Sequence, residues 1–134
     1  MRRNALAYIA GILTAFIMVG LVEALGHLVY PPPSNFDFGD EQALADLVAS
    51  LPVGAILFVA AAWSIGAFTG SLVAGRIGTL KPIYFSSVVT GLILAGGITQ
   101  LMIIAHPTWF AIVSLGGVVA AGVAATLVIP GIRK

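Results

Sequence analysis

Four long apolar stretches, separated by short polar segments, dominate the pattern of the chain. They cover about residues 5–29, 52–75, 82–105 and 108–129. A helix crosses the hydrocarbon core of a bilayer with about 20 apolar residues, so each stretch is long enough to span. The pattern therefore predicts an all-α integral membrane protein, a four-helix bundle that forms a single transmembrane domain over residues 1–134.

Prolines mark most of the expected helix ends. The run Pro31-Pro32-Pro33 ends the first span, because consecutive prolines supply no backbone donors. Pro52 and Pro82 fall in the first turns of the second and third spans, where a missing donor is harmless. Asn4 is expected to cap the first helix. The segment Val22-Glu23-Ala24 weakly resembles a signal-peptide cleavage site, but the surrounding apolar run exceeds the roughly 7–15 residues of a signal core, which favours a span.

The polar segment between the first two spans, residues 31–51, predicts one short amphipathic helix. Asp40 precedes EQALADLVASL and is a suitable N-cap. Leu44, Leu47, Val48 and Leu51 fall at i, i+3, i+4 and i+7, which places them on one apolar face. We expect this helix to lie on the membrane surface, either separate from the second span or continuous with it.

The few charges indicate which way the chain crosses the membrane. Only 8% of residues are charged, against about 25% in a soluble domain, so lipid is the expected solvent. With four spans, every basic residue falls on one side: Arg2, Arg3, Arg76, Lys81, Arg133 and Lys134. Basic residues near span ends stay cytoplasmic. We therefore expect a multi-pass protein of the inner (plasma) membrane with both termini in the cytoplasm.

Composition also excludes several functions. A net charge of +1 without a basic tract gives no case for nucleic acid, and the absence of cysteine excludes thiolate chemistry. No nucleophile with an adjacent base, phosphate loop or haem-attachment motif is present, so we expect no enzymatic activity and no cofactor. The expected partners are the lipid bilayer and either further copies of the chain or another membrane protein.

Small residues four positions apart recur in all four spans and predict close helix packing. Helices in lipid associate through close backbone approach or hydrogen bonds, because lipid tails are as apolar as leucine. Candidate packing residues are Gly20, Trp63, Gly66, Gly70, Gly117 and Ala121. Spacing alone leaves open whether such contacts lie within one chain or between copies.

Glu23 is the sharpest chemical signal, because an acidic side chain near the middle of a span costs about 2.5 kcal/mol or more to insert. His27 follows one helical turn later on the same face. Gln100 stands at a similar depth in the third span, and His106 lies in the turn after it. These four residues are candidates for binding a proton or a cation. The alternative is that Glu23 bonds Gln100 or Trp63 and only holds helices in register. A metal site is a weaker third reading, because two ligands are too few.

Three groups of residues carry a resemblance to a set of small four-helix bacterial inner-membrane proteins that have no assigned activity. They are Glu23…Gly26-His27…Tyr30-Pro31-Pro32, Ala62-Trp63…Gly66-Ala67-Phe68…Gly70 and His106-Pro107…Trp109-Phe110. The resemblance implies a fold and a compartment but no function. The small multidrug-resistance transporters, also four helices with a glutamate in the first, are a looser comparison. This chain departs from them because aromatics occur in its third span only at Tyr84 and Phe85, and because the polar segment with its helix is additional.

Two functions of different classes follow from this pattern. In the first, the protein is a non-catalytic membrane subunit or scaffold that docks partners through its glycine and alanine faces. In the second, it is a proton- or cation-coupled transporter or channel that uses Glu23 and His27. Between the depth of Glu23 and the cytoplasmic side, the spans offer only serine and threonine hydroxyls, which can bond their own helix backbone. This favours the scaffold for a single chain, and leaves open a pathway between copies.

Overall fold

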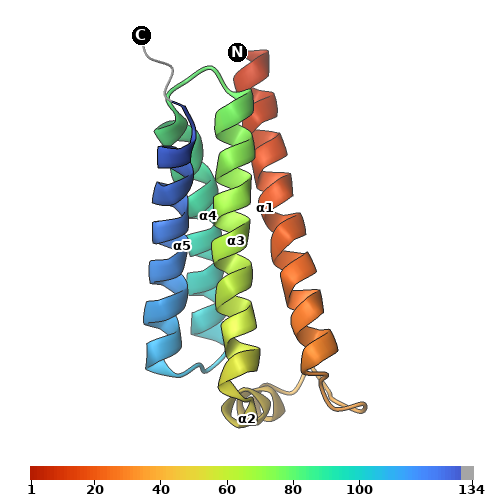
Figure 1. Cartoon of the computed structure of the whole chain (residues 1–134). Helices are drawn as coiled ribbons and strands as arrows, with labels where there is room; N and C mark the ends of the chain where they lie inside the picture. The colour runs from red at the N-terminus through yellow and green to blue at the C-terminus, as the bar shows by residue number, and fades with distance from the viewer. Residues whose placement is uncertain (131–134) are drawn as a thin grey trace.

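The computed structural model describes residues 1–130, which form five α-helices and no strand (Figure 1). The helices are α1 (Arg2–Val29), α2 (Glu41–Ser50), α3 (Val53–Ile77), α4 (Pro82–Ile103) and α5 (Thr108–Val128). All except α2 are long and apolar enough to cross a membrane. The prediction of an all-α fold with four candidate membrane spans is therefore confirmed for the described residues. Arg133 and Lys134, which the sequence assigns to the cytoplasmic side, lie outside the described residues.

The span ends differ from the predicted ones by a few residues, for local reasons. α4 ends at Ile103 rather than near Ala105, because Ile104 already has an extended backbone with φ −112° and ψ 126°. Pro107 disfavours helical conformation in the residue before it, so the chain leaves the helix ahead of the turn. α1 begins at Arg2 with Met1 as its N-cap, and Asn4 makes no cap hydrogen bond.

Asn4 instead ties α1 to the turn between α3 and α4. Its Oδ1 accepts hydrogen bonds from the backbone N–H of Thr79 at 2.8 Å and from the Thr79 hydroxyl at 2.9 Å. Arg3 donates from Nε to the carbonyl oxygen of Ile77 at 2.6 Å. The prediction that Asn4 caps α1 is therefore wrong. Met1 takes the cap position, which leaves the Asn4 side chain free to bond a neighbouring segment.

α3 is the central helix and contacts α1, α4 and α5. It is also the most buried of the four long helices. The hydrophobic core includes Trp63 of α3 itself and, from α4 and α5, Phe85, Val89, Phe110 and Val118. α1 packs mainly on α3 and only lightly on α4.

The α1–α3 interface is tightest in the half nearest the N-terminus, where both helices carry small residues. A Cβ built at Gly70 would lie 2.5 Å from the carbonyl oxygen of Gly11 and 2.7 Å from the Cβ of Ala15. A Cβ at Gly66 would lie 2.8 Å from the carbonyl oxygen of Ala15. Only glycine allows this backbone approach, so Gly66 and Gly70 hold the crossing of the two helices.

Toward the other end of the bundle, large side chains separate α1 from α3. The Phe58 ring packs on Gly26, and the Tyr30 ring reaches Gly54 and lies edge-on to Phe58 with centroids 6.1 Å apart. Figure 1 shows α1 leaving the rest of the bundle in this direction. We call this the α2 end and the opposite one the terminal end.

α2 lies across the α2 end of the bundle (Figure 1). Asp40 caps it as predicted, accepting from the backbone N–H groups of Gln42 at 3.0 Å and Ala43 at 3.1 Å. Leu51 is extended and Pro52 follows, so α2 and α3 are separate helices.

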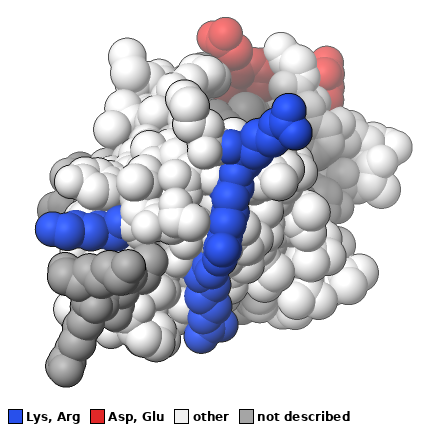
Figure 2. Space-filling view, turned by 90° about the horizontal axis from the view of Figure 1, so that it is seen from above, with Lys and Arg blue, Asp and Glu red and all other residues white. Residues whose placement is uncertain are grey.

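Charge is segregated between the two ends. The described basic residues Arg2, Arg3, Arg76 and Lys81 lie at the first and last turns of helices that meet at the terminal end. Figure 2, viewed onto that end, shows the basic side chains in front and acidic ones only at the far edge. The acids Asp37, Asp40, Glu41 and Asp46 lie in and before α2.

Candidate functional site

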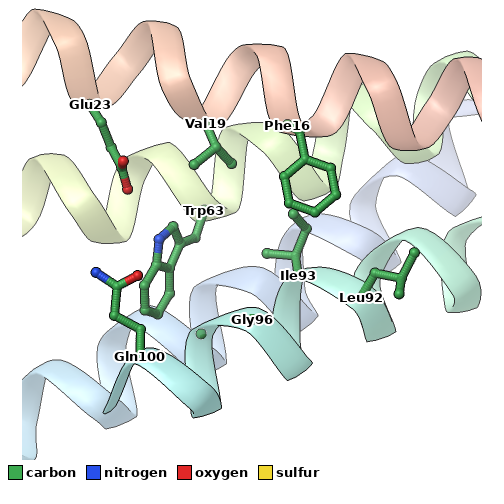
Figure 3. Close-up of a pocket in the computed structure, with 9 residues that line it drawn as sticks. Phe16, Val19, Glu23, Trp63, Leu92, Ile93, Gly96 and Gln100 are labelled. Atoms are coloured by element: carbon green, nitrogen blue, oxygen red, sulfur yellow. The ribbon is translucent and has the colours of Figure 1, made fainter. Parts of the chain in front are cut away.

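The gap between α1 and the rest of the bundle holds two adjoining cavities in the half toward the α2 end. The first, which we call the deep cavity, has a volume of about 170 Å³ and lies between α1, α3 and α4 (Figure 3). Its lining residues are Phe16, Val19, Glu23, Trp63, Leu92, Ile93, Gly96, Gly97 and Gln100. Apart from Glu23, Gln100 and the Trp63 indole N–H, these side chains offer only apolar surface.

The second, the α2 cavity, has a volume of about 340 Å³ and is covered by α2. All four residues of the predicted apolar stripe line it: Leu44, Leu47, Val48 and Leu51. Phe58 and Val59 of α3 add apolar surface, while His27 and Tyr30 contribute polar atoms. Glu23 and Gln100 line both cavities, so they mark the boundary between them.

Glu23 is half-buried, and polar side chains from α1 and α3 lie near its carboxyl. The indole of Trp63 on α3 approaches the carboxyl as a hydrogen-bond donor (Figure 3). His27, one turn along α1, lies within electrostatic range of the carboxyl, and its own side chain is exposed. The sequence predicted the shared face of Glu23 and His27, and it gave Trp63 as one of two alternative hydrogen-bond partners of Glu23.

Gln100 comes from α4 and faces the same space as Glu23 and the Trp63 indole nitrogen (Figure 3). The sequence predicted that Gln100 and Glu23 lie at a similar depth, and in the structure both residues line the deep cavity. The side chain of Gln100 is half-buried. Its amide can accept or donate a hydrogen bond toward anything that enters from the α2 cavity.

Trp63 is held in place from two sides. Its ring lies edge-on to that of Phe110, with centroids 5.8 Å apart, and only 4% of the residue is exposed. On the α4 side, a Cβ built at Gly97 would lie 2.7 Å from Cζ3 of the indole. The glycine leaves the space that the ring fills, so the indole N–H is presented to Glu23 in a fixed orientation.

His106 lies apart from the other three polar candidates. It sits in the α4–α5 turn, with Nδ1 2.8 Å from the carbonyl oxygen of Ile104. Its ring stacks on Phe110 with centroids 4.7 Å apart and an interplanar angle of 20°. His106 therefore touches the site only through Phe110, which in turn packs on Trp63. Within residues 1–130, no group of three or more His, Cys, Asp or Glu side chains is placed to hold a metal ion.

Most hydroxyl groups on the terminal side of the deep cavity are satisfied by their own helix. Thr14, Thr69 and Ser87 each donate to a carbonyl four residues earlier, at 2.7–2.8 Å. Ser86 is different, because it donates to the carbonyl oxygen of Gly122 on α5 at 2.7 Å. The deep cavity ends among Phe16, Leu92 and Ile93. The polar groups of the site therefore do not continue toward the terminal end through the described part of this chain.

The predicted packing residues fall into two groups. Gly66, Gly70 and Trp63 contact neighbouring helices, and Gly117 faces Ser64 of α3. Ala121 is partly buried against the core. Gly20, by contrast, lies on the outer surface of α1, with no atom within 4 Å of a built Cβ.

Sequence reasoning missed several residues that shape the site. Phe58 and Tyr30 prop α1 away from α3, and Gly97 makes room for Trp63. The available signal was weak, since Gly96-Gly97 is one of two adjacent glycine pairs in the chain and nothing in the sequence links it to Trp63. The sequence predicted the apolar stripe of α2, but it did not reveal that this stripe lines a cavity.

Comparison of the chain with protein-family models, with curated proteins and with solved structures finds no match. The fold defines the class as a helical membrane protein with four candidate spans.

Proposed function

We propose that this chain is a non-catalytic subunit or scaffold of the inner membrane that docks other membrane helices through small-residue faces. The proposal rests on pairs of small residues that pack against no other helix of this chain. α1, α4 and α5 each present a glycine and an alanine four residues apart on the outer surface. These pairs are Gly20 with Ala24, Gly91 with Ala95, and Gly116 with Ala120.

Each of these pairs has open space in front of it. No atom lies within 4 Å of a Cβ built at Gly20, Gly91 or Gly116, and all three paired alanines are exposed. In the same chain, the glycines that do pack, such as Gly70, bring two backbones into contact. A small pair on a lipid-facing helix lets a second helix approach in the same way, which is a main source of helix association in bilayers.

The distribution of charge supports an orientation. Arg2, Arg3, Arg76 and Lys81 gather at the terminal end (Figure 2). Because basic residues near span ends are retained in the cytoplasm, we place both termini there and α2 on the outer surface of the membrane. An alkaline phosphatase domain inserted after Ser34 should then be active and one fused at the C-terminus inactive. The reverse pattern would contradict this orientation.

Docking is tested by substituting isoleucine at the open glycines, one helix at a time. Gly20→Ile, Gly91→Ile and Gly116→Ile should each leave the monomer folded, and at least one should abolish crosslinking to further copies or to a partner in intact membranes. Ala61→Ile is the matched control, because Ala61 is exposed on α3 between the bulky Leu57 and Ile65. If all three glycine variants crosslink like the wild type, the small faces do not dock helices.

A second function, proton- or cation-coupled transport, rests on Glu23, His27 and Gln100 lining one cavity at the α2 end. The cavity does not continue toward the terminal end, so transport would need a pathway between copies. Flux of protons and monovalent cations into proteoliposomes is the test, with Glu23→Gln beside the wild type. Flux that vanishes in Glu23→Gln would favour transport, and no flux in either folded protein would favour the scaffold.

A further inference from the structure

We propose that the terminal end of the bundle binds the headgroup of an anionic phospholipid, which bridges the first turn of α1 and the turn between α3 and α4. Four side chains form the site: Arg2, Arg3, Arg76 and Lys81. We call them the basic cluster. The proposal does not depend on the docking faces described above, because it concerns the end of the bundle and not the outward faces of its helices.

The basic cluster comes from two segments that lie far apart in the sequence, and hydrogen bonds hold these segments together. Asn4 of α1 accepts from the backbone N–H of Thr79 at 2.8 Å and from its hydroxyl at 2.9 Å. Arg3 donates from Nε to the carbonyl oxygen of Ile77 at 2.6 Å. Every member of the cluster is one of these bonded residues or lies within two positions of one along the chain. The fold therefore brings the basic residues of α1 beside those of the α3–α4 turn.

No Asp or Glu side chain accompanies the basic cluster. Glu23 lies in the half of α1 toward the α2 end, and the other four acidic residues lie in and before α2. Figure 2 shows basic side chains in a ridge across the terminal end, with acidic ones only at the far edge. Like charges held close together repel one another, and an anion bound between them offsets that repulsion. The charge of the cluster thus selects an anionic ligand.

The basic cluster also offers hydrogen-bond donors that suit a phosphate group. Arg3 uses Nε for Ile77, and a guanidinium has five N–H donors, so its terminal nitrogens can still bind a phosphate. The side chains of Arg2, Arg76 and Lys81 are exposed. Arginine binds phosphate oxygens in a bidentate manner, and lysine adds a point charge. The cluster can therefore contact one phosphate group from both segments.

Apolar side chains beside the basic cluster select a lipid over a soluble phosphate. Leu6 follows the arginines of α1 by about one turn and is 60% exposed. Tyr84 follows Lys81 by one turn of α4 and is 54% exposed. Tyrosine is enriched where a span meets the headgroup region, and basic residues next to a span attract anionic lipids. A headgroup at the cluster would thus lay its acyl chains along the apolar surfaces of α1 and α4.

Lipid binding is measured by native mass spectrometry of the detergent-purified protein, which counts the lipid molecules that each chain retains. The protein is titrated with phosphatidylglycerol and, in parallel, with phosphatidylcholine that has the same acyl chains. Phosphatidylglycerol should bind about tenfold more tightly or better, and its advantage should shrink as the ammonium acetate concentration rises, because salt screens charge. Equal affinity for the two lipids would overturn the proposal.

The soluble headgroup distinguishes a lipid from a free phosphate. Glycerol 3-phosphate carries the same phosphate chemistry without acyl chains, so it should not displace phosphatidylglycerol when added at the same concentration. Displacement at equal concentration would show that the basic cluster takes a soluble phosphate, and would overturn the assignment to a lipid.

Two paired substitutions test the charge of the cluster with the bonds of Arg3 and Asn4 left in place. Arg76→Gln combined with Lys81→Gln should weaken phosphatidylglycerol binding about tenfold or more, since each basic residue near an anionic lipid contributes about fivefold. The affinity for phosphatidylcholine should stay the same. Arg76→Lys combined with Lys81→Arg keeps both charges and should bind phosphatidylglycerol within about twofold of the wild type. Unchanged phosphatidylglycerol binding in the glutamine pair would contradict the site.

A further variant tests whether the headgroup bridges the two segments. Asn4→Ala removes both hydrogen bonds to Thr79 and keeps every charge, so phosphatidylglycerol should bind several-fold more weakly. Thr14→Ala is the matched control on α1, because the Thr14 hydroxyl bonds only the carbonyl oxygen of Ala10 in its own helix. It should leave the affinity unchanged. Wild-type affinity in Asn4→Ala would show that the basic residues act separately, and would overturn the bridge.

Discussion

The indole of Trp63 lies against the backbone of Gly97, so closely that a Cβ at Gly97 would come within 2.7 Å of Cζ3 of the ring. This contact joins the central helix α3 to α4 at the depth of Glu23. It also fixes the direction in which the indole N–H points. The position of one glycine on α4 thereby determines how a tryptophan on α3 meets a carboxyl on α1.

Gly97→Val should therefore displace Trp63 and destabilise the bundle by about 1–3 kcal/mol, the usual cost of overpacking. The loss is measured as a lower unfolding free energy in lipid or detergent, together with a shift of Trp63 emission in a Trp109→Phe background. Gly96→Val is the matched control, because no atom lies within 4 Å of a Cβ at Gly96. Similar losses in both variants would mean that the effect comes from valine in the helix and not from the Trp63 contact.

The second prediction concerns Glu23 as the partner of the Trp63 indole. Glu23→Leu leaves a buried N–H without an acceptor and should lower the unfolding free energy by about 1–3 kcal/mol. Glu23→Gln keeps an acceptor oxygen and should be tolerated. In a Trp63→Phe background the N–H is absent, so the additional cost of Glu23→Leu should shrink. A cost that is the same in both backgrounds would show that the two side chains are not coupled.

The third prediction compares two buried serines. Ser86 donates to Gly122 of the neighbouring helix, whereas the hydroxyl of Ser71 is buried without a hydrogen-bond partner within the described residues. Ser86→Ala should cost about 0.6 kcal/mol and at most about 1.7 kcal/mol, the range of interhelical bonds in membranes. Ser71→Ala should be neutral or stabilising, because it removes an unpaired polar atom. The free energy of unfolding of the two variants is measured at equilibrium. A larger loss of stability in Ser71→Ala than in Ser86→Ala would contradict the view that only Ser86 makes a stabilising hydrogen bond.

The fourth prediction concerns the cover of the α2 cavity. Asp40→Ala removes the cap of α2 and should cost about 0.5–2 kcal/mol of local helix stability. Amide exchange at Gln42, Ala43 and the following residues should then become several-fold faster. Asp46→Ala makes the same charge change on α2 without touching the cap, and should leave the exchange rates at Gln42 and Ala43 nearly unchanged. If amide exchange became equally fast in both variants, the loss of negative charge, and not the loss of the cap, would be the cause.

The elements of the fold could be predicted because each depends on a local property of the chain. Apolar length defines the four spans, and Asp40 followed by the stripe from Leu44 to Leu51 defines α2. The meeting of Glu23 and Gln100 followed from their similar depths in two spans. The depth of a residue can be predicted from its position within a span, because every spanning helix crosses the same thickness of bilayer.

The lateral arrangement could not be read in the same way. Gly66 and Gly70 pack inside the bundle, whereas Gly91 and Ala95 have the same spacing and face outward. The spacing of small residues indicates that a helix has a flat face, but it does not indicate which helix packs against that face. His106 shows the same limit, because its sequence position near Gln100 does not reveal that its ring stacks on Phe110.

The divergence of α1 from α3 gives the molecule a different width at its two ends. Backbone contact at Gly11 and Gly70 keeps the terminal half narrow, while the Phe58 and Tyr30 rings broaden the half near α2. Because the contact between Gly11 and Gly70 holds the two helices together at the terminal end, the angle between α1 and α3 sets the width of the bundle, and the room for both cavities, at the α2 end.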